Sequence, residues 1–99
     1  MKPKLFLLKM PFTDNDGNSW FCSHCALIEG ALSVNPHWCQ EIEIHRISNK
    51  KPRTELVNIL GEEKQWMPVL ILTANKTITD PIEITRYLAK SYGGASPHP

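Results

Sequence analysis

Two cysteines separated by two residues, Cys22 and Cys25, have the spacing in this chain that most clearly indicates chemistry. They stand between an apolar run at 5–8 and a helical pattern that begins near Ala26. The start of a helix offers unpaired backbone N–H groups and a partial positive charge, and both favour a thiolate over a thiol. Because the thiolate is the reactive form of cysteine, this placement predicts redox or thiol-exchange chemistry at the pair.

His24 lies inside the motif, and two interpretations of it stay open. A protonated imidazole beside Cys22 would favour its thiolate or tune the reduction potential of the pair. Alternatively, His24 is a solvent-exposed residue of the first helical turn. The pair itself has a structural alternative, in which Cys22 and Cys25 are two unreactive thiols.

A metal site is the rival class of chemistry for the same thiols. Cys22, Cys25, His37 and Cys39 form the pattern C-x2-C-x11-H-x-C, which supplies four ligands suited to tetrahedral zinc. However, His37 and Cys39 come after the end of the helix predicted to begin at Ser23, about 15 Å from its start. Direct ligation would then be impossible, so we expect no metal site, and we expect Cys39 to be a small apolar residue near the second strand.

Composition excludes several other classes of function. The chain has 99 residues and a net charge of +1, which predicts one domain over 1–99 and no electrostatic footprint for nucleic acid. The apolar runs at 5–8 and 69–72 are too short for a secretory signal or a transmembrane helix, so no membrane association is expected. The odd number of cysteines, three, favours a reducing compartment and predicts a cytoplasmic protein.

The elements that must position the thiols follow from hydropathy patterns. The continuous apolar runs at 5–8 and 69–73 predict strands buried on both faces. The alternation at 41–47 predicts a half-exposed strand, and the β-branched stretch 77–79 predicts a short one. Residues 10–18 hold nearly every turn-forming residue type and predict a loop.

Three helices are predicted from apolar spacing and from terminal signals. The first runs from Ser23 to Leu32 or Val34 and stops before Pro36. The second covers 52–60, with Pro52 at its first position, and the third follows Asp80 as cap, with Pro81 at its first position. A flexible tail is expected over 94–99.

The resulting order is β-α-β-α-β-β-α, an α/β fold. The two fully apolar strands should be central and the other two should be edges, which gives a four-stranded mixed sheet of spatial order 2-1-3-4 flanked by helices. The right-handed crossover makes the first two strands parallel. The tight turn between the last two makes that pair antiparallel.

At this point the chain resembles the thioredoxin-like superfamily, in its glutaredoxin and glutathione-transferase N-domain form. Three segments over roughly 4–93 carry the likeness: Cys22-Ser23-His24-Cys25, Trp66-Met67-Pro68-Val69, and the stretch 80–89, which ends Arg-Tyr-Leu-Ala. The stretch 24–30 also resembles an uncharacterised bacterial family of small glutaredoxin-like proteins.

The resemblance implies roles for site residues. Cys22 would be the exposed nucleophile, and Cys25, one helical turn deeper, would be the resolving thiol. A cis-proline at Pro68 would expose the backbone of Met67 to an extended peptide or to glutathione. Two further contacts are implied, Trp66 at the rim of the site and Asp80 near the γ-glutamyl end of glutathione.

These expectations describe a small cytosolic thiol–disulfide oxidoreductase of glutaredoxin or thioredoxin type. Its partner would be a disulfide-containing protein or glutathione, the latter a candidate co-substrate, with no other cofactor. The alternative is a noncatalytic module that docks an extended peptide or glutathione against Met67 and Pro68. Nearby Trp20 and Phe21 either shield the thiols or cap the core.

Overall fold

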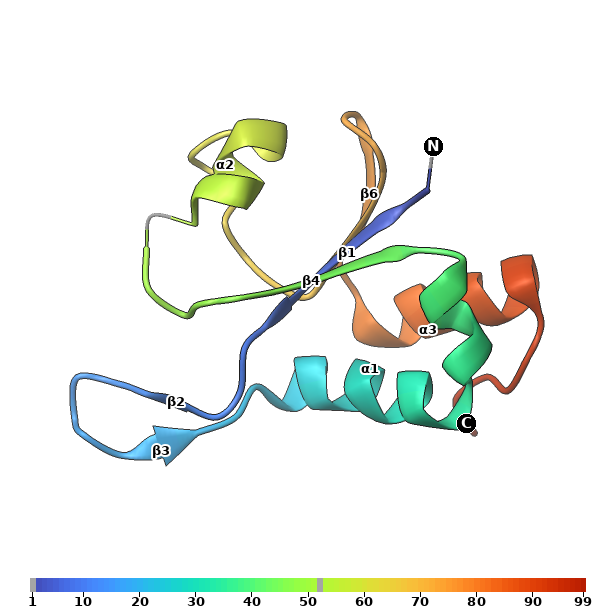
Figure 1. Ribbon diagram of the computed structural model, residues 1–99, viewed down its shortest axis with the longest axis horizontal. Helices are drawn as coiled ribbons and strands as arrows, with labels where there is room; N and C mark the ends of the chain where they lie inside the picture. Colours follow the sequence, from blue (N-terminus) through green and yellow to red (C-terminus); the bar gives the residue numbers. More distant parts are fainter. Residues whose placement is uncertain (1, 52) are drawn as a thin grey trace.

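The computed structural model describes residues 2–51 and 53–99 (Figure 1). Pro52, expected at the first position of the second helix, lies outside the described residues. In chain order the elements are β1 (Lys4–Leu8), β2 (Phe12–Thr13), β3 (Ser19–Trp20), α1 (Ser23–Val34), the 3-10 helix η1 (Pro36–Gln40), β4 (Glu43–Ile47), α2 (Thr54–Leu60), β5 (Val69–Thr73), β6 (Lys76–Ile78) and α3 (Pro81–Tyr92).

The main sheet has four strands in the order β4-β1-β5-β6. Strand β1 pairs in parallel with β4, and β5 pairs antiparallel with both β1 and β6. The predicted spatial order, the parallel β1–β4 pair and the antiparallel β5–β6 pair are confirmed, whereas the sequence made no prediction for the direction of β1 against β5. The α/β architecture with this mixed sheet has the thioredoxin-like topology.

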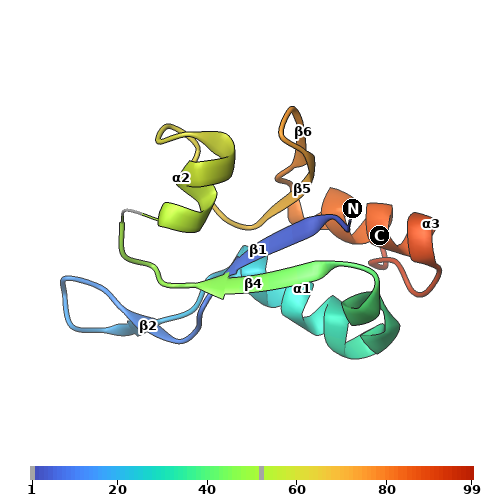
Figure 2. The same cartoon turned by 45° about the horizontal axis from the view of Figure 1, so that its top comes forward.

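Helices cover both faces of the sheet unequally. The two 12-residue helices α1 and α3 lie together on one face, whereas the 7-residue α2 stands alone on the other (Figures 1 and 2). Strand side chains alternate between faces, so each central strand feeds two separate cores. In β1, Leu5 and Leu7 point to the α1 and α3 side, whereas Phe6 points to α2.

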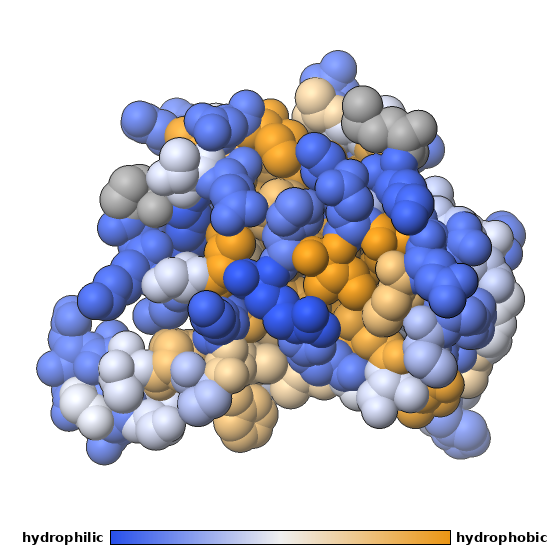
Figure 3. Space-filling view, viewed as in Figure 1, coloured by the Kyte–Doolittle hydropathy of each residue, from blue (hydrophilic) through white to orange (hydrophobic). Residues whose placement is uncertain are grey.

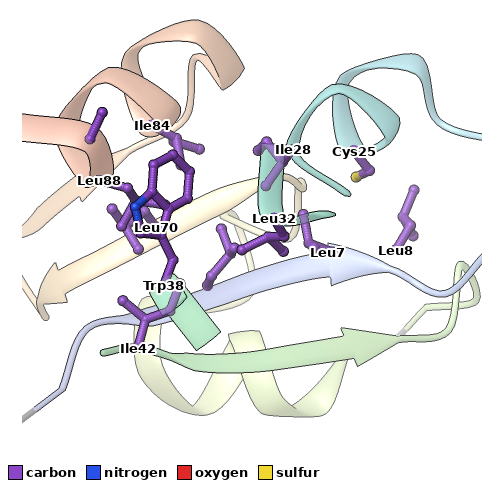
Figure 4. Packing of buried hydrophobic residues seen from close by; sticks show 12 residues of the cluster. Leu7, Leu8, Cys25, Ile28, Leu32, Trp38, Ile42, Leu70, Ile84 and Leu88 are labelled. Atoms are coloured by element: carbon purple, nitrogen blue, oxygen red, sulfur yellow. The ribbon is translucent and has the colours of Figure 1, made fainter. Parts of the chain in front are cut away.

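The core beneath α1 and α3 extends from the thiols to a buried tryptophan (Figure 4). Cys25 lies at the end of this cluster near Leu8, and Trp38 fills the opposite end beside Ile84 and Leu88. Trp38 is fully buried, and its indole Nε1–H donates to the carbonyl oxygen of Gly93 at 2.8 Å. No periodic pattern in the sequence indicated this residue, because η1 is too short to have one.

Cys39, in the same short helix, corrects an expectation. We expected a small apolar residue near the second strand, but the side chain is exposed to solvent. In a 3-10 helix of three residues per turn, the neighbour of an inward-facing residue points away from that direction. The burial of Trp38 therefore exposes Cys39.

The second core lies between the sheet and α2. Its buried members are Phe6, Leu56, Val69 and Ile71. Leu56 is the buried residue that α2 contributes, and the helix ends at Gly61, whose φ of 92° suits glycine. A helix of two turns covers little of a sheet face, and this leaves one end of the face open.

A hairpin corrects the loop predicted over 10–18. Phe12 pairs with Trp20 and Thr13 with Ser19, so β2 and β3 form a separate two-stranded sheet. The turn that joins them holds Gly17 at a φ of 79°, and the N–H of Gly17 donates to the carbonyl of Asp14 at 2.9 Å. Two-residue strands carry no period-two signal, so the turn-forming residues around them dominated the pattern.

The boundaries of the other elements differ by a few residues. Strand β4 begins at Glu43 rather than at 41, because the preceding residues close the turn of η1 through a bond from the Glu41 N–H to the Trp38 carbonyl. Helix α2 begins at Thr54. Ala95 lies inside the predicted tail, and its N–H donates to Oδ1 of the buried Asn35 at 2.8 Å.

Candidate thiol site at the start of α1

Cys22 is the N-cap residue of α1. Its backbone is extended, with φ −82° and ψ 116°, and its Sγ accepts the backbone N–H of Cys25 at 3.2 Å. An N-cap acceptor satisfies one of the unpaired amides at a helix start and lies at the positive end of the helix dipole. The first turn of α1 contains no acidic residue that would oppose a negative charge on this sulfur.

The two thiols have different surroundings. Cys22 is half-buried, whereas Cys25 is fully buried against the sheet (Figure 4). Burial raises the pKa of the Cys25 thiol to about 12, because a thiolate there would lose its hydration, and the neighbouring Cys22 raises it further. Both cysteines are free thiols in the structure, so the pair is in its dithiol form.

Met10 contacts the site in a way the sequence did not predict. The backbone N–H of Cys22 donates to the Met10 Sδ at 3.1 Å, and the Met10 side chain packs against the main core. A thioether is a weak acceptor, so this contact positions the strand entering the helix cap more than it stabilises a charge. No sequence signal marks Met10, since it lies 12 positions from Cys22 in a segment predicted as loop.

The segment before β5 was predicted to form the second wall of the site. The Met67–Pro68 peptide bond is cis, and Pro68 is buried. Met67 packs against both core clusters and Cys22 packs against the first of them. Trp66 is 51% exposed.

Two aromatic side chains just before the motif are largely open to solvent. Trp20 is 47% exposed and Phe21 is 66% exposed, which favours a role at the surface over one that caps the core. The Trp20 indole N–H reaches Oδ1 of Asp16 at 3.4 Å, which fixes the ring to the hairpin. Phe21 directly precedes the nucleophile candidate Cys22 in the chain.

His24 and Asp80 complete the set of residues named from the sequence. His24 is exposed on the first turn of α1. Asp80 caps α3, because its Oδ1 accepts the N–H groups of Ile82 and Glu83 at 2.9 and 3.0 Å. The predicted helix cap is therefore confirmed, and the same carboxylate oxygen is occupied by backbone amides.

A cavity of about 320 Å³ lies between the β2–β3 hairpin and the segment that follows β4, and neither cysteine lines it. It is lined by residues that follow the carboxyl ends of the parallel strands β1 and β4, including Lys9, Pro11 and Lys50, and by residues of the β2–β3 hairpin. Ligands of α/β proteins commonly bind outside the carboxyl ends of parallel strands. Lys9 and Pro11 flank Met10, which connects this cavity to Cys22.

The ligands of the rival zinc pattern lie at opposite ends of α1. Cys22 and Cys25 are at its start, and His37 and Cys39 follow its end, which is about 18 Å away for 12 residues. The His37 Nε2 lies 2.9 Å from the carbonyl oxygen of Gly93. Over residues 2–51 and 53–99, no three His, Cys, Asp or Glu side chains are grouped as metal ligands.

Comparison with known proteins gives a family without an assigned activity. A family model described as "Protein of unknown function (DUF3088)" matches residues 2–96, so the chain belongs to this family. Searches of curated proteins and of solved structures found no match. In the part of the chain that the structure describes, no helix has the length and apolar character needed to cross a membrane.

Proposed function

We propose that this member of the DUF3088 family is a small thiol–disulfide oxidoreductase in which Cys22 attacks and Cys25 resolves. One observation carries the proposal. The half-buried sulfur of Cys22 lies at the positive end of α1 and accepts an amide N–H, and the second thiol of the pair is buried one turn deeper. Such an arrangement suits one attacking and one resolving thiol.

The reaction proceeds in two exchange steps. The Cys22 thiolate attacks one sulfur of a substrate disulfide, forms a mixed disulfide and releases the first substrate thiolate, which takes a proton from water. Cys25 then loses its proton and attacks the Cys22 sulfur, which releases the second substrate thiol and leaves a Cys22–Cys25 disulfide. Two electrons pass from the protein dithiol to the substrate, and an external dithiol restores the starting form.

The burial of Cys25 sets the relative rates of these steps. A thiol whose pKa is raised to about 12 is almost entirely protonated at neutral pH, so little of the resolving nucleophile is present. We therefore expect the second step to be the slower one. A mixed disulfide at Cys22 should accumulate during turnover.

The walls of the site suit an extended substrate. The backbone of Met67 beside Pro68 and the exposed ring of Trp66 offer a strand-like edge with an apolar rim. For a smaller substrate, the two lysines of the neighbouring cavity suit carboxylates, which supports glutathione as a candidate co-substrate. We place the activity in the cytosol, where dithiols are kept reduced.

The buried state of Cys25 also supports a second candidate, the noncatalytic binding module. If the resolving thiol never ionises, the same walls would bind an extended peptide or glutathione without turnover. The two candidates predict different behaviour of the Cys22→Ser variant.

The test is the reduction of insulin, and of a mixed disulfide of glutathione, with a dithiol as reductant. Cys22→Ser should lose at least 99% of the catalysed rate, and Cys25→Ser should form a stable mixed disulfide detectable by mass. Cys39→Ser is the matched control and should keep the full rate, because that exposed thiol lies beyond the far end of α1. Equal rates for wild type and Cys22→Ser would remove Cys22 as nucleophile and leave the binding module.

A further inference from the structure

A second cavity lies at the opposite end of β1 from the thiols. Its volume is about 610 Å³, and it is larger than the cavity lined by the β2–β3 hairpin. It is lined by Ile59 of α2, by residues 71–74 at the end of β5, and by Lys2 and Lys4 at the start of β1. Its volume is in the range of small-molecule sites.

The cavity exists because α2 is too short to cover its face of the sheet. Phe6, Val69 and Ile71 form an apolar row on this face, and Leu56 of α2 covers its centre. Ile59 remains half-buried at the end of the helix. Figure 3 shows apolar surface between α2 and the β5–β6 hairpin, bordered by hydrophilic residues.

A positive charge lies at the end of this apolar row. Lys4 is directly opposite Ile71 in the antiparallel pairing of β1 with β5, and two positions from Phe6 along β1. Cross-strand partners and residues two apart share a sheet face, so the Lys4 side chain emerges on the α2 side. Lys2, two positions before Lys4 in the chain, lines the same cavity.

One carboxylate lies across the sheet from Lys4 without pairing with it. Glu43 is its partner in the parallel pairing with β4, but the Glu43 Oε1 is turned to the His45 Nε2 at 3.6 Å. His45 also lies 3.3 Å from Oε2 of Glu55 and stacks on Phe6 with ring centroids 4.7 Å apart. Within the described residues, no ion pair involves Lys2 or Lys4.

We propose that this cavity is a binding site for a small amphiphilic carboxylate, a molecule with one acidic group and an alkyl body. Ile59 and Ile71, which line the cavity, contact the alkyl body, and the ammonium of Lys4, assisted by Lys2, pairs with the acid. A neutral apolar molecule would leave the charge pairing unused, and an amine would be repelled. The site does not depend on the thiol chemistry, since β1 separates the two by about 15 Å.

The test is an NMR titration of the full chain with three probes of equal chain length, octanoate, 1-octanol and octylammonium. Octanoate should shift the amide signals of residues 71–74 and of α2, and it should bind about tenfold more tightly than 1-octanol, the gain of one charge-assisted pair. Octylammonium should bind most weakly. Equal affinity for octanoate and octylammonium, or shifts spread evenly over the surface, would overturn the proposal.

Three further tests use variants to show which residues bind octanoate. Lys4→Gln should remove the preference for octanoate over 1-octanol, whereas Lys9→Gln, on the same chain segment beyond the other end of β1, should keep it. Glu43→Gln removes a negative charge on the strand next to Lys4 and should tighten octanoate binding. Thr73→Trp, at an exposed lining residue, should fill the cavity and abolish binding of both probes; retained binding would place the site elsewhere.

Discussion

At the scale of single residues, the pair Cys22 and Cys25 combines an accessible sulfur with a sealed one. The difference arises from position on α1. The N-cap residue lies outside the helical turn and contacts solvent, whereas the residue three positions later faces the sheet. One helical turn is therefore enough to give two identical side chains different burial.

This difference predicts the order of alkylation. Iodoacetamide at pH 8 to 10 should modify Cys22 and Cys39 in the folded protein and leave Cys25 unmodified, because only the thiolate reacts and the pKa of Cys25 is raised to about 12. Peptide mass spectrometry of the labelled protein measures this. In denaturant all three should react, which is the control, and early modification of Cys25 in the native protein would contradict the burial argument.

The same raised pKa makes folding stability depend on pH. In the unfolded chain Cys25 has its ordinary pKa near 9, so its folded-state value of about 12 means that the native protein holds this proton more tightly. The contribution to stability is complete below about pH 9 and is lost as the pH rises towards 12. Cys25→Ser should lack this part of the alkaline decline.

The sequence revealed the roles of residues that act on their neighbours in the chain, but not those of residues whose contacts are distant in the sequence. The thiol pair and the cap Asp80 were evident, because each role depends on a few neighbouring positions. The role of Met10 was not evident, because the β2–β3 hairpin separates Met10 from Cys22 in the sequence. The roles of Trp66, Met67 and His24 in binding stay predictions.

At the scale of elements, both long helices begin with a side chain that accepts backbone amides. Cys22 does this for α1 with a sulfur, and Asp80 does it for α3 with a carboxylate. Oxygen is the stronger acceptor, and a carboxylate also complements the helix dipole. Helix α3 therefore has the firmer start, while α1 begins at the thiol that we propose as the nucleophile.

This comparison predicts the effect of changing Asp80. Asp80→Ala should lower the free energy of unfolding by about 1 kcal/mol, because the N–H groups of Ile82 and Glu83 lose their acceptor. Asp80→Asn keeps an acceptor and should cost only a few tenths of that. Urea unfolding measures both. If glutathione contacts this carboxylate, Asp80→Asn should weaken glutathione binding without lowering stability, which separates the two roles.

Elements were predictable where periodicity extends over several residues. The apolar runs of β1 and β5 and the cap signals of α3 placed these elements within one or two residues. The hairpin of β2 and β3 and the 3-10 helix η1 were missed, because segments of two to five residues are too short for a periodic signal.

At the scale of the whole molecule, the end of the chain is tied to the end of α1. The Asn35 side chain donates through Nδ2 to the carbonyls of Ala31 and Ala95 and accepts the N–H of Ala95. Close to this site, the Trp38 indole N–H donates to the carbonyl oxygen of Gly93, and the His37 Nε2 lies 2.9 Å from the same oxygen. These contacts join segments about 60 positions apart, so local sequence patterns could not indicate them.

The replacement Asn35→Asp tests this tie with almost no change of shape. It keeps the acceptor for the Ala95 N–H but removes both donors and places a charge against two carbonyls, so the free energy of unfolding should fall by about 2 kcal/mol or more. Limited proteolysis should then cut near residues 95–97 sooner. Ser33→Asp, on an exposed position of α1, is the matched control, and an equal loss there would attribute the effect to charge alone.

The separate pairing of β2 with β3 has a consequence for engineering. These strands bond to each other and not to the four-stranded sheet, and their turn at Asp14–Gly17 is exposed. Doubling the length of such a loop costs only about 0.6 kcal/mol of closure entropy. A fluorescent or affinity label grafted into the turn should therefore leave the fold intact while reporting on binding near the β2–β3 hairpin.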